Sequence, residues 1–413
     1  MARAFTPIDA CAIMTTLVEQ ITGETGVAQV DASTFASSGE LVMSYGTENV
    51  LEKLSILVGR TLMAVRPYEA KIRIINALNT ELYSNRIRKI SYYSKKPQDA
   101  GDFNTNLHKN LEDGYDNGTN VGQSVGSMWV QNKPKVLEMN FGGQFVWDDS
   151  LTIYEDALKV AFTDAASFAS FMTGIMTEKA NDIESQKEAF NRLAVLEKVG
   201  QVYSMSASMP NSVVNLTKEF NAKYGTNYTS QELRTTYVKE FLEFYVAYFK
   251  IISDRMTNRT TSFHWSPTND DNLVLLRHTP KAKQKLMLYS PLFTEAKAKV
   301  FPEIFNPQYL PVENGEMVDY WQSFGDPTKV DIVPAVTDTV TGQQKAGNRV
   351  QIDYLVGMLF DEDALMVDYQ LNDATPTPLE ARKKYRNVWY HFSRNIISDP
   401  TENCIIFIMK DGE

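Results

Sequence analysis

Apolar residues recur at steps of three and four between Thr163 and Val199, far from both ends of the chain. This spacing predicts one long amphipathic helix, because residues at such steps share a helix face. Thr163 is suited to cap the start, and Lys198 followed by Gly200 supplies a basic last turn and a left-handed stop. At 1.5 Å per residue the helix would be roughly 50 Å long, well beyond the usual dozen or so residues. Its apolar stripe is Phe168, Phe171, Met172, Ile175, Met176, Ile183, Phe190, Leu193 and Leu196.

The N-terminal part of the chain carries signals for two further helices separated by an arm. A proline at the first helical position and a glycine after the last predict a helix over Pro7–Thr22. The small and polar residues of Glu24–Tyr45 show no period, which predicts an extended arm. A second apolar face starts at Thr47, and this helix should end before Pro67, because the residue before a proline avoids the helical region.

A long polar stretch then lies between two strand-like segments, Ile87–Ser94 and Val136–Phe145. Within the second segment apolar and polar residues alternate with a period of two, as expected for a strand with one apolar face. The sequence between them, from Pro97 to Gly126, is rich in glycine, asparagine and aspartate and is typical of turns. Loops this long are usually functional or disordered. We therefore predict a two-stranded arm that projects from the body.

A second long helix is predicted after the first. Thr229 and Glu232 have the spacing of a capping box, and the helix should reach about Met256. Its aromatic residues between Tyr237 and Tyr248 are compatible with a stacking platform for sugars or bases. An aromatic stripe at helical spacing more often belongs to the core, and we favour that interpretation.

The remainder of the chain consists of short apolar runs separated by turns, which predicts an α+β region with mostly local connections. Tyr354–Phe360 is one of these runs, and a short helix is expected near Glu295–Val300. The chain should end with two strands, Tyr385–Ile397 and Cys404–Met409, joined through Ser398-Asp399-Pro400.

Composition narrows the class of protein. The chain has 413 residues, of which 43% are hydrophobic and 22% charged, so a disordered chain is excluded. No apolar run approaches the roughly 20 residues of a membrane span, and the N-terminus lacks the pattern of a signal peptide. Cys11 and Cys404 give no disulfide framework, which favours a reducing compartment. The net charge of −10 argues against a protein that grips nucleic acid phosphates directly.

A search for catalytic, cofactor-binding or metal-binding residues finds no candidate that we adopt. Phosphate-cradling and dinucleotide-binding motifs are absent. The histidines lack metal-ligand spacing, and neither cysteine is close to one in sequence; they are His108, His264, His278 and His391.

Three charged groups nevertheless have two interpretations each. Asp361-Glu362-Asp363 suits a catalytic or cation-binding cluster, but a solvated turn between Tyr354–Phe360 and Leu365–Tyr369 is favoured. Asp148-Asp149 precedes a helix-like stretch, where carboxylates complement the helix dipole, so we expect a capping role first and a catalytic role only if a pocket surrounds them. Lys95-Lys96 is either an attachment point for an acidic neighbour or plain solvated charge.

Three segments, taken with the order of the predicted parts, resemble a known family. They are F-G-G-Q-F-V-W-D-D-S-L at Phe141–Leu151, L-M-L-Y-S-P-L-F-T-E-A-K-A-K-V-F-P-E-I-F-N at Leu286–Asn306, and Y-L-V-G-M-L-F-D-E-D-A-L-M-V at Tyr354–Val367. The first looks like a strand, an acidic turn and the start of the spine helix. The chain resembles the major capsid protein of tailed double-stranded-DNA bacteriophages, with the Hong Kong 97-type fold. The resemblance is closest to short-tailed phages of the phi-twenty-nine group.

The resemblance implies an α+β fold with four parts. Residues 1–84 would form the N-terminal arm and helices, and residues 85–147 the extended loop (E-loop) that overlaps a neighbour. Residues 148–200 and 378–413 would form the peripheral domain, with the spine helix and the C-terminal strands. Residues 201–377 would form the axial domain.

The resemblance also implies a structural, non-catalytic function without cofactors. The subunit would assemble with itself into pentamers and hexamers of an icosahedral head, in the host cytoplasm, with a separate scaffolding protein and a portal. Double-stranded DNA would be enclosed but not specifically bound, and no membrane partner is expected. Two alternatives remain: an encapsulin-type compartment shell, and a hydrolytic enzyme that uses Asp361 or Asp363.

Overall fold

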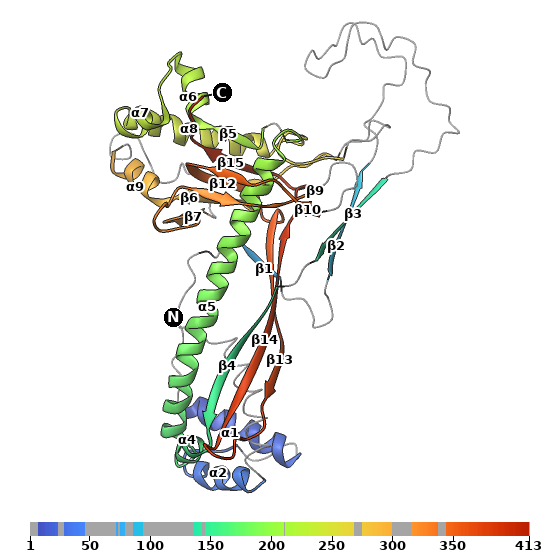
Figure 1. Ribbon diagram of the computed structural model, residues 1–413, viewed down its shortest axis with the longest axis vertical. Coiled ribbons are helices and arrows are strands. Elements are labelled where there is room, and N and C mark those ends of the chain that lie inside the picture. The colour runs from blue at the N-terminus through green and yellow to red at the C-terminus, as the bar shows by residue number, and fades with distance from the viewer. Residues whose placement is uncertain are drawn as a thin grey trace, which may run out of the picture.

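The long helix predicted from the sequence is α5 (Ala165–Ser204), which runs from the lower end of the molecule into the upper lobe (Figure 1). Its 40 residues correspond to about 60 Å. Asp164 caps the helix, because its carboxylate accepts a hydrogen bond from the backbone N–H of Ser167 at 2.8 Å. The predicted cap at Thr163 is therefore wrong by one residue; the shorter Thr163 side chain instead donates to the carbonyl of Val160.

The predicted stop at Gly200 is also wrong, because the helix continues through this residue. A Cβ at Gly200 would lie 2.8 Å from Cγ2 of Ile332 and 2.9 Å from Cβ of Pro334. Contacts this short are not tolerated between carbon atoms, so only glycine allows the helix to approach this segment so closely. The glycine serves packing between elements and not termination.

The structure is a computed structural model, and it describes residues 7–23, 29–45, 72, 75–78, 86–93, 135–142, 145–209, 211–267, 275–299, 315–337 and 344–412. The predicted helix between Thr47 and Pro67 and the polar stretch Pro97–Gly126 lie outside these residues. None of the helices in the described ranges has the combination of length and apolar composition that a bilayer crossing requires. Cys11 and Cys404 are both free thiols.

A long, narrow sheet accompanies α5 through the lower limb (Figure 1). Its strand order is β1-β13-β14-β4, in which β1 pairs parallel with β13 and the other pairs are antiparallel. The strands are β1 (Asn76–Leu78), β4 (Phe145–Tyr154), β13 (Leu365–Pro376) and β14 (Tyr385–Ser398). Alternate residues of β4 and β14 are buried, which leaves one face of the sheet toward the core and the other toward solvent.

The core of the limb is completed by three helices at its lower end. These are α1 (Pro7–Thr22), as predicted, α2 (Phe35–Ser44) and α4 (Glu155–Ala161). Aromatic and aliphatic side chains from the helices and the sheet pack together there. The cluster includes Met14, Leu17, Phe35, Leu151, Ile153, Phe162, Phe168, Met172, Val388 and Tyr390.

Helix α2 corrects the prediction of an extended arm over Glu24–Tyr45. Asp31 organises its entry, since one carboxylate oxygen accepts hydrogen bonds from the backbone N–H groups of Ser33 and Thr34. Phe35, Gly39 and Val42 are buried at helical spacing against the limb core. Small residues hid this short apolar face, because serine and glycine favour turns when no partner surface is known.

The upper lobe contains a five-stranded sheet with the order β5-β15-β12-β6-β7. Every residue of the central strands β12 and β15 is buried, as expected for strands covered on both faces. Strands β5 and β7 pair parallel with their neighbours, and the other pairs are antiparallel. The strands are β5 (Val213–Asn215), β6 (Gln284–Tyr289), β7 (Gly315–Val318), β12 (Leu355–Asp361) and β15 (Cys404–Ile408).

Helices and two small strand pairs surround this sheet. Helix α8 packs on it, with the rings of Phe249 and Phe407 centred 4.1 Å apart. Strand β8 (Val330–Ile332) pairs with β11 (Val350–Ile352), and β9 (Ala335–Thr337) pairs with β10 (Gln344–Ala346). The helical elements are α6 (Leu216–Tyr224), α7 (Ser230–Thr235), α8 (Val238–Met256), α9 (Ser290–Lys299) and a 3₁₀ turn at Lys281–Lys283.

The predicted second long helix is in fact two helices, α7 and α8. The capping box of Thr229 and Glu232 is present at the start of α7. The chain breaks because the N–H groups of Thr236 and Tyr237 both donate to the carbonyl of Glu232, and the Tyr237 ring stacks on Tyr228 at 4.0 Å. The aromatic stripe is core, as favoured from the sequence: Phe241, Phe244 and Tyr245 are buried.

Two predicted pairs of strands joined by short turns are crossings between the two sheets. Strands β12 and β13 are consecutive but lie in different sheets, and the same is true of β14 and β15. The C-terminal strands therefore do not pair with each other. Each joins the sheet whose buried face matches its own apolar residues, a long-range choice that is not visible in local spacing.

The two strand-like flanks of the polar stretch do pair, as β2 (Arg86–Tyr93) and β3 (Lys135–Gly142). They form a separate antiparallel ribbon beside the junction of limb and lobe (Figure 1). We call this ribbon the hairpin. Together, the two sheets and the helices confirm the α+β class, with the expected order of hairpin, spine helix and lobe.

Candidate functional site: the polar junction and the exposed apolar surfaces

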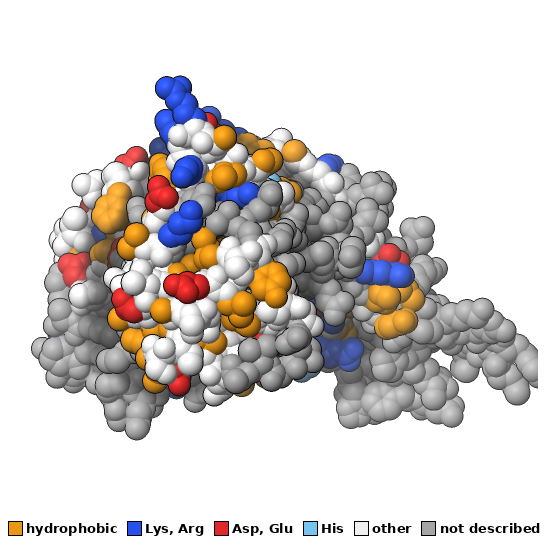
Figure 2. Space-filling view, turned by 90° about the horizontal axis from the view of Figure 1, so that it is seen from below, with side chains coloured by type: hydrophobic (Ala, Val, Ile, Leu, Met, Phe, Trp, Pro, Cys, Tyr) orange, Lys and Arg blue, Asp and Glu red, His pale blue; other side chains and the backbone are white. Residues whose placement is uncertain are grey.

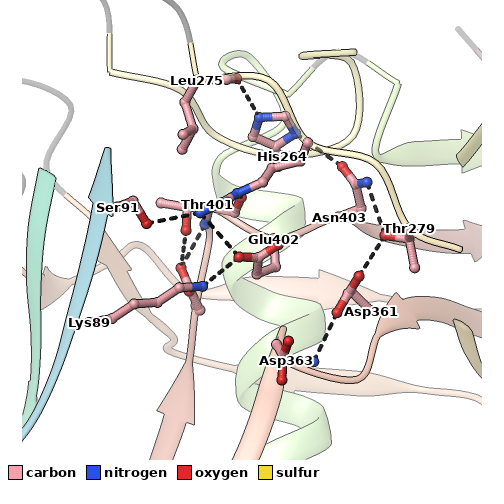
Figure 3. A network of polar contacts seen from close by, with 12 residues as sticks. Lys89, Ser91, His264, Leu275, Thr279, Asp361, Asp363, Thr401, Glu402 and Asn403 are labelled. Atoms are coloured by element: carbon pink, nitrogen blue, oxygen red, sulfur yellow. Dashed lines mark hydrogen bonds and ion pairs between the residues drawn. The ribbon is translucent and has the colours of Figure 1, made fainter. Parts of the chain in front are cut away.

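Charged and polar side chains meet where the hairpin, α5 and both sheets come together (Figure 3). They come from β2, from the segment between α8 and β6, from the end of β12 and from the connection between β14 and β15. We call this cluster the polar junction. Its members are Lys89, Ser91, Lys198, Gln201, His264, Arg277, Thr279, Asp361, Ser398, Asp399, Thr401, Glu402 and Asn403.

Lys89 anchors the inner face of the hairpin. Its ammonium group forms an ion pair with Asp399 and lies 2.5 Å from Oε1 of Glu402. The Asp399 side chain is 1% exposed and that of Glu402 is 12% exposed, so Lys89 neutralises two carboxylates that water hardly reaches. These carboxylates raise the pKa of Lys89 against the opposing effect of burial. Burial raises the pKa of Glu402, and Lys89 counteracts this.

Arg277 forms the second link to the hairpin. Its guanidinium donates to Oγ of Ser91 at 2.9 Å and pairs with Oε1 of Glu402 at 3.2 Å. Its Nε donates to the carbonyl of Thr401 at 3.3 Å. One side chain thus ties β2 to the connection between the two sheets.

Lys198 lies inside the junction on α5 and is 0% exposed. Its ammonium group donates to the backbone carbonyl of Asp399 at 2.6 Å and to Oε1 of Gln201 at 3.1 Å. Burial lowers the pKa of Lys198. Gln201 in turn accepts a hydrogen bond from the hydroxyl of Ser398 at 2.8 Å. The prediction that Lys198 supplies the basic last turn is wrong, because the helix continues to Ser204. The residue instead fastens the helix to the connection between β14 and β15.

A second set of contacts runs deeper, from His264 to Asp361 (Figure 3). Nδ1 of His264 is 3.0 Å from Oδ1 of Asn403, and Nδ2 of Asn403 is 3.1 Å from Oγ1 of Thr279. The Thr279 hydroxyl donates to Oδ2 of Asp361 at 2.7 Å. This chain of hydrogen bonds connects three loops to the end of β12.

The acidic triplet does not behave as one solvated turn. Asp361 is 4% exposed and also accepts a hydrogen bond from the backbone N–H of Asp363; burial raises its pKa. Glu362 lies 2.8 Å from Nζ of Lys283, while the Asp363 side chain is 52% exposed. The solvated interpretation therefore fails for Asp361, which has a partner inside the lobe.

Asp148 and Asp149 do not cap a helix, which corrects the prediction. Both lie in the middle of β4, with helix α4 starting several residues later. Asp149 pairs with Lys179 of α5 at 2.8 Å, and Asp148 lies opposite His391 of β14. The strand continues because β14 supplies a partner along its whole length. Lys95-Lys96 lies outside the described residues.

The histidines occupy unrelated places. His264 is buried, His278 is exposed beside a short β-bridge, and His391 lies in β14; His108 is outside the described residues. Within the parts of the chain that the structure describes, no group of three histidine, cysteine, aspartate or glutamate residues is arranged to hold a metal ion.

Sequence reasoning considered Lys198, His264 and Asp361 separately but missed the polar junction in which they lie together. One signal was present: the run Ser398–Asn403 is polar although apolar strands flank it on both sides. Asp399 there forms a local turn by accepting hydrogen bonds from the N–H and the hydroxyl of Thr401. The partners Lys89 and Arg277 lie more than a hundred residues away, so no local pattern connects them.

The outer face of the hairpin carries exposed apolar residues beside the ion pair of Arg88 and Glu138. Alternation along the paired strands directs Lys89 and Ser91 to the junction and leaves Ile90, Tyr92 and Val136 outside, with 42%, 68% and 53% of their surfaces exposed. Tyr92 and Val136 are direct partners across the ribbon. Exposed apolar groups gathered on one face are typical of interaction sites.

A second exposed apolar surface lies at the lower end of the limb. Figure 2, seen from below, shows hydrophobic side chains spread over this end and interspersed with acidic and basic ones. They come from the helices and from the end of β4. The most exposed are Ile8, Leu41, Tyr45, Tyr154 and Val160.

Solved structures with similar chains come from several bacteriophages. The capsid structure of Staphylococcus phage Andhra has 12% identity and a TM-score of 0.49, with 84% of this chain and 86% of that chain covered. The mature capsid of bacteriophage PhiM1 has 9% identity and a TM-score of 0.39, with 84% and 89% covered. The capsid of cyanophage P-SCSP1u has 10% identity and a TM-score of 0.39, with 82% and 86% covered. A comparison with curated proteins finds no match.

The sequence itself matches a family model. The model describes the Phi29-like phage major capsid protein and matches residues 110–408, which is more than half of the chain. The matched region contains β3, α5, the lobe sheet, the limb sheet except β1, and most of the polar junction. The chain therefore belongs to the Phi29-like phage major capsid protein family.

Proposed function

We propose that this protein builds the shell of a phage head from pentamers and hexamers of itself and encloses double-stranded DNA. Membership of the family makes it a structural capsid component and not an enzyme. The observation that carries the finer proposal is the pair of exposed apolar surfaces at separate places, on the hairpin and at the lower end of the limb. A hydrolytic role for Asp361 or Asp363 is not favoured, because the family is structural.

Separate surfaces suit a shell better than an isolated dimer. A two-fold dimer needs one self-complementary patch, whereas rings and closed shells use heterologous contacts between different patches. The hairpin projects beside the body and the lower surface lies at the far end of the limb (Figure 1). A subunit with such surfaces can contact more than one copy at a time.

We further propose a division into four functional parts. Residues 1–84 serve as N-terminal arm and helices, and residues 85–147 as the E-loop. Residues 148–200 with 378–413 form the peripheral domain, and 201–377 the axial domain. The two sheets depart from these bounds at two strands, because β13, within 201–377, lies in the limb sheet and β15, within 378–413, lies in the lobe sheet.

The remaining partners are proposed from chemistry and from the family. The net charge of −10 supports a wall that encloses DNA without adhering to it. Assembly in the host cytoplasm with a separate scaffolding protein and a portal completes the proposal. Cargo enzymes that co-purify with the shells, instead of scaffold or DNA, would point to an encapsulin-type compartment.

The proposal is tested by expressing the full chain alone and together with a candidate scaffolding protein, followed by negative-stain electron microscopy. We expect closed particles in the co-expressed sample, with rings or irregular shells at most in the other. A protein that stays monomeric in both samples at micromolar concentration would contradict the proposal.

A further inference from the structure

The chain of hydrogen bonds from His264 to Asp361 determines which of its groups carry protons. His264 is 0% exposed, and its Nε2 lies 2.9 Å from the carbonyl oxygen of Leu275. A carbonyl oxygen only accepts hydrogen bonds, so Nε2 carries a proton. Its Nδ1 faces the Asn403 side-chain amide, which offers either an acceptor or a donor, depending on its orientation.

The other end of the chain fixes that choice. Thr279 lies between Asn403 and Asp361, and its hydroxyl group has a single proton to donate. When Asp361 is a carboxylate, Thr279 donates to it and accepts from the Asn403 NH₂ group. The Asn403 oxygen then faces His264, which must carry a second proton on Nδ1.

A protonated Asp361 reverses every donor in the chain. Asp361 then donates to Thr279, and Thr279 donates to the oxygen of a rotated Asn403 amide. The Asn403 NH₂ group donates to Nδ1 of a neutral His264. Both arrangements satisfy every contact, and both hold one proton between His264 and Asp361.

Any other proton count leaves one contact unsatisfied. With neither group protonated, two acceptors face each other at one position of the chain; with both protonated, two donors do. Buried polar groups without partners are costly. The geometry therefore favours one shared proton over both none and two.

The charged groups around the chain do not replace this coupling. Arg277 and Asp399 face His264 with opposite signs, and Lys283 and Asp363 do so at Asp361. Burial lowers the pKa of His264 and raises the pKa of Asp361, which brings the two groups closer in proton affinity. Lys89 and Glu402 lie further along the junction beside Asp399.

The shared proton is connected to the hairpin through a short segment. The segment is Leu275–Thr279, and the hydrogen bonds of His264 and Asn403 hold its two ends. Arg277 lies between these two points and reaches Ser91 of β2. Loss of a contact at either end would therefore loosen the link through Arg277, whose backbone is also bonded to Thr260. The hairpin has apolar contacts as well, since Met139 and Phe141 of β3 pack against Ile397.

We propose that His264 and Asp361 share one proton through Asn403 and Thr279, and that this proton latches the hairpin to the body. When the junction opens to water, His264 and Asp361 keep the proton only up to the ordinary histidine pKa of about 6.5. The closed chain holds the proton to higher pH. The latch is therefore fully present between the ordinary pKa values of aspartate and histidine, about 4 and 6.5, and is lost as pH rises through the midpoint of the closed pair. It also weakens below about pH 4, where a second proton binds the opened pair.

The test uses NMR of the unassembled full-length protein labelled with ¹⁵N-histidine and ¹³C-aspartate, with H264Q and D361N to assign the signals. We expect the His264 ring and the Asp361 carboxyl to change at one common midpoint above pH 6.5, with one proton released in total. Two independent midpoints, or a common midpoint below 6.5, would overturn the proposal.

Two substitutions of Thr279 form a matched pair. T279S keeps the hydroxyl and should keep the common midpoint, whereas T279V removes it and should separate the two midpoints by about one pH unit or more. The wild-type titration alone decides the proposal if T279V fails to fold.

Hydrogen exchange of β2 tests the link to the hairpin separately. After correction for the intrinsic effect of pH, we expect opening of Arg86–Tyr93 to increase about tenfold across the midpoint in the wild type, since local opening follows local stability. If the protection of β2 from hydrogen exchange does not change at the midpoint, the shared proton does not fasten the hairpin. Neither readout requires particles, so the result is independent of the proposed capsid assembly.

Discussion

At the scale of single residues, α5 contains two glycines with opposite surroundings. Gly200 touches Ile332 and Pro334 through the space that a side chain would fill, whereas nothing lies within 4 Å of a Cβ at Gly174. Glycine is intrinsically unfavourable in a helix at both positions. Only at Gly200 does packing compensate for this.

G200A should therefore lower the free energy of unfolding by about 1–3 kcal/mol, because the added methyl group overpacks the contact with β8 and its neighbours. G174A is the matched control, and it should raise stability by about 0.5–1 kcal/mol through helix propensity alone. Urea denaturation of the unassembled subunit measures both. Equal effects of the two substitutions would show that Gly200 does not have a packing role.

The same scale shows what a sequence pattern misses. The apolar stripe of α5 was recognised, and its members Phe168, Met172 and Phe190 are buried. Lys198 was assigned to a basic last turn of the helix, although it is fully buried, which is rare for a lysine without partners. Its partners, Gln201 and the carbonyl of Asp399, come from a neighbouring turn and from a connection two hundred residues away. Only the folded chain places that carbonyl next to the helix.

At the scale of elements, the hairpin has two basic residues, Lys89 and Arg88, whose ion pairs contribute differently to stability. Lys89 points to the junction and pairs with carboxylates that are nearly buried. Arg88, on the opposite face of the same strand, pairs with Glu138 at 2.8 Å, and their side chains are 58% and 42% exposed. Exposed pairs contribute little, because water screens them.

K89M should cost about 2–3 kcal/mol, somewhat less than the ~3–5 typical of fully buried pairs because Lys89 is partly exposed. The cost arises because Asp399 and Glu402 lose their main counter-charge. R88M, the matched control, should change stability by about 0–1 kcal/mol. Hydrogen exchange within Arg86–Tyr93 and urea denaturation together measure the effects. Indistinguishable protection of β2 in the two variants would rule out Lys89 as an anchor.

Element boundaries followed local signals where those signals were strong. Pro7–Thr22, the capping box at Thr229 and the two hairpin strands were predicted from spacing and end signals, and the structure confirms them. The failures are tertiary: β12 and β14 each continue into a different sheet, although the sequence suggested local pairing. Strand pairing depends on which buried face each strand meets, and that information is not local.

At the scale of the whole molecule, the hairpin and its connecting stretch are separable from the two cores. The limb core and the lobe core consist mainly of other elements. The polar junction and a small apolar cluster of Met139, Phe141 and Ile397 fasten the hairpin to them. We therefore expect that deletion of Pro97–Gly126 leaves a soluble, folded subunit that cannot close a shell. Circular dichroism and urea denaturation report folding, and electron microscopy reports particles.

A control replaces Pro97–Gly126 with the same number of glycine and serine residues. This variant keeps the reach of the segment and removes its sequence, so it separates the two contributions to assembly. Normal shells from the deleted protein would show that this stretch is not an assembly arm.

The overall plan was predicted better than the junction. The resemblance supplied the order of hairpin, spine helix and lobe, and the structure has that order. The junction was missed because its charged residues belong to segments that are remote in sequence, such as Lys89 and Glu402. A carboxylate in a polar turn looks solvated until the segment that covers it is known, as Asp361 also illustrates.

The two crossings between the sheets have a mechanical consequence. The chain passes between limb and lobe at the end of β12 and again after β14, and α5 spans the same place without interruption. A single connection between limb and lobe would allow rotation, but three connections side by side resist torsion about the limb axis. A subunit built in this way transmits a twist from its lower end to its lobe instead of absorbing it. Differences in curvature around a shell would therefore be taken up where subunits touch.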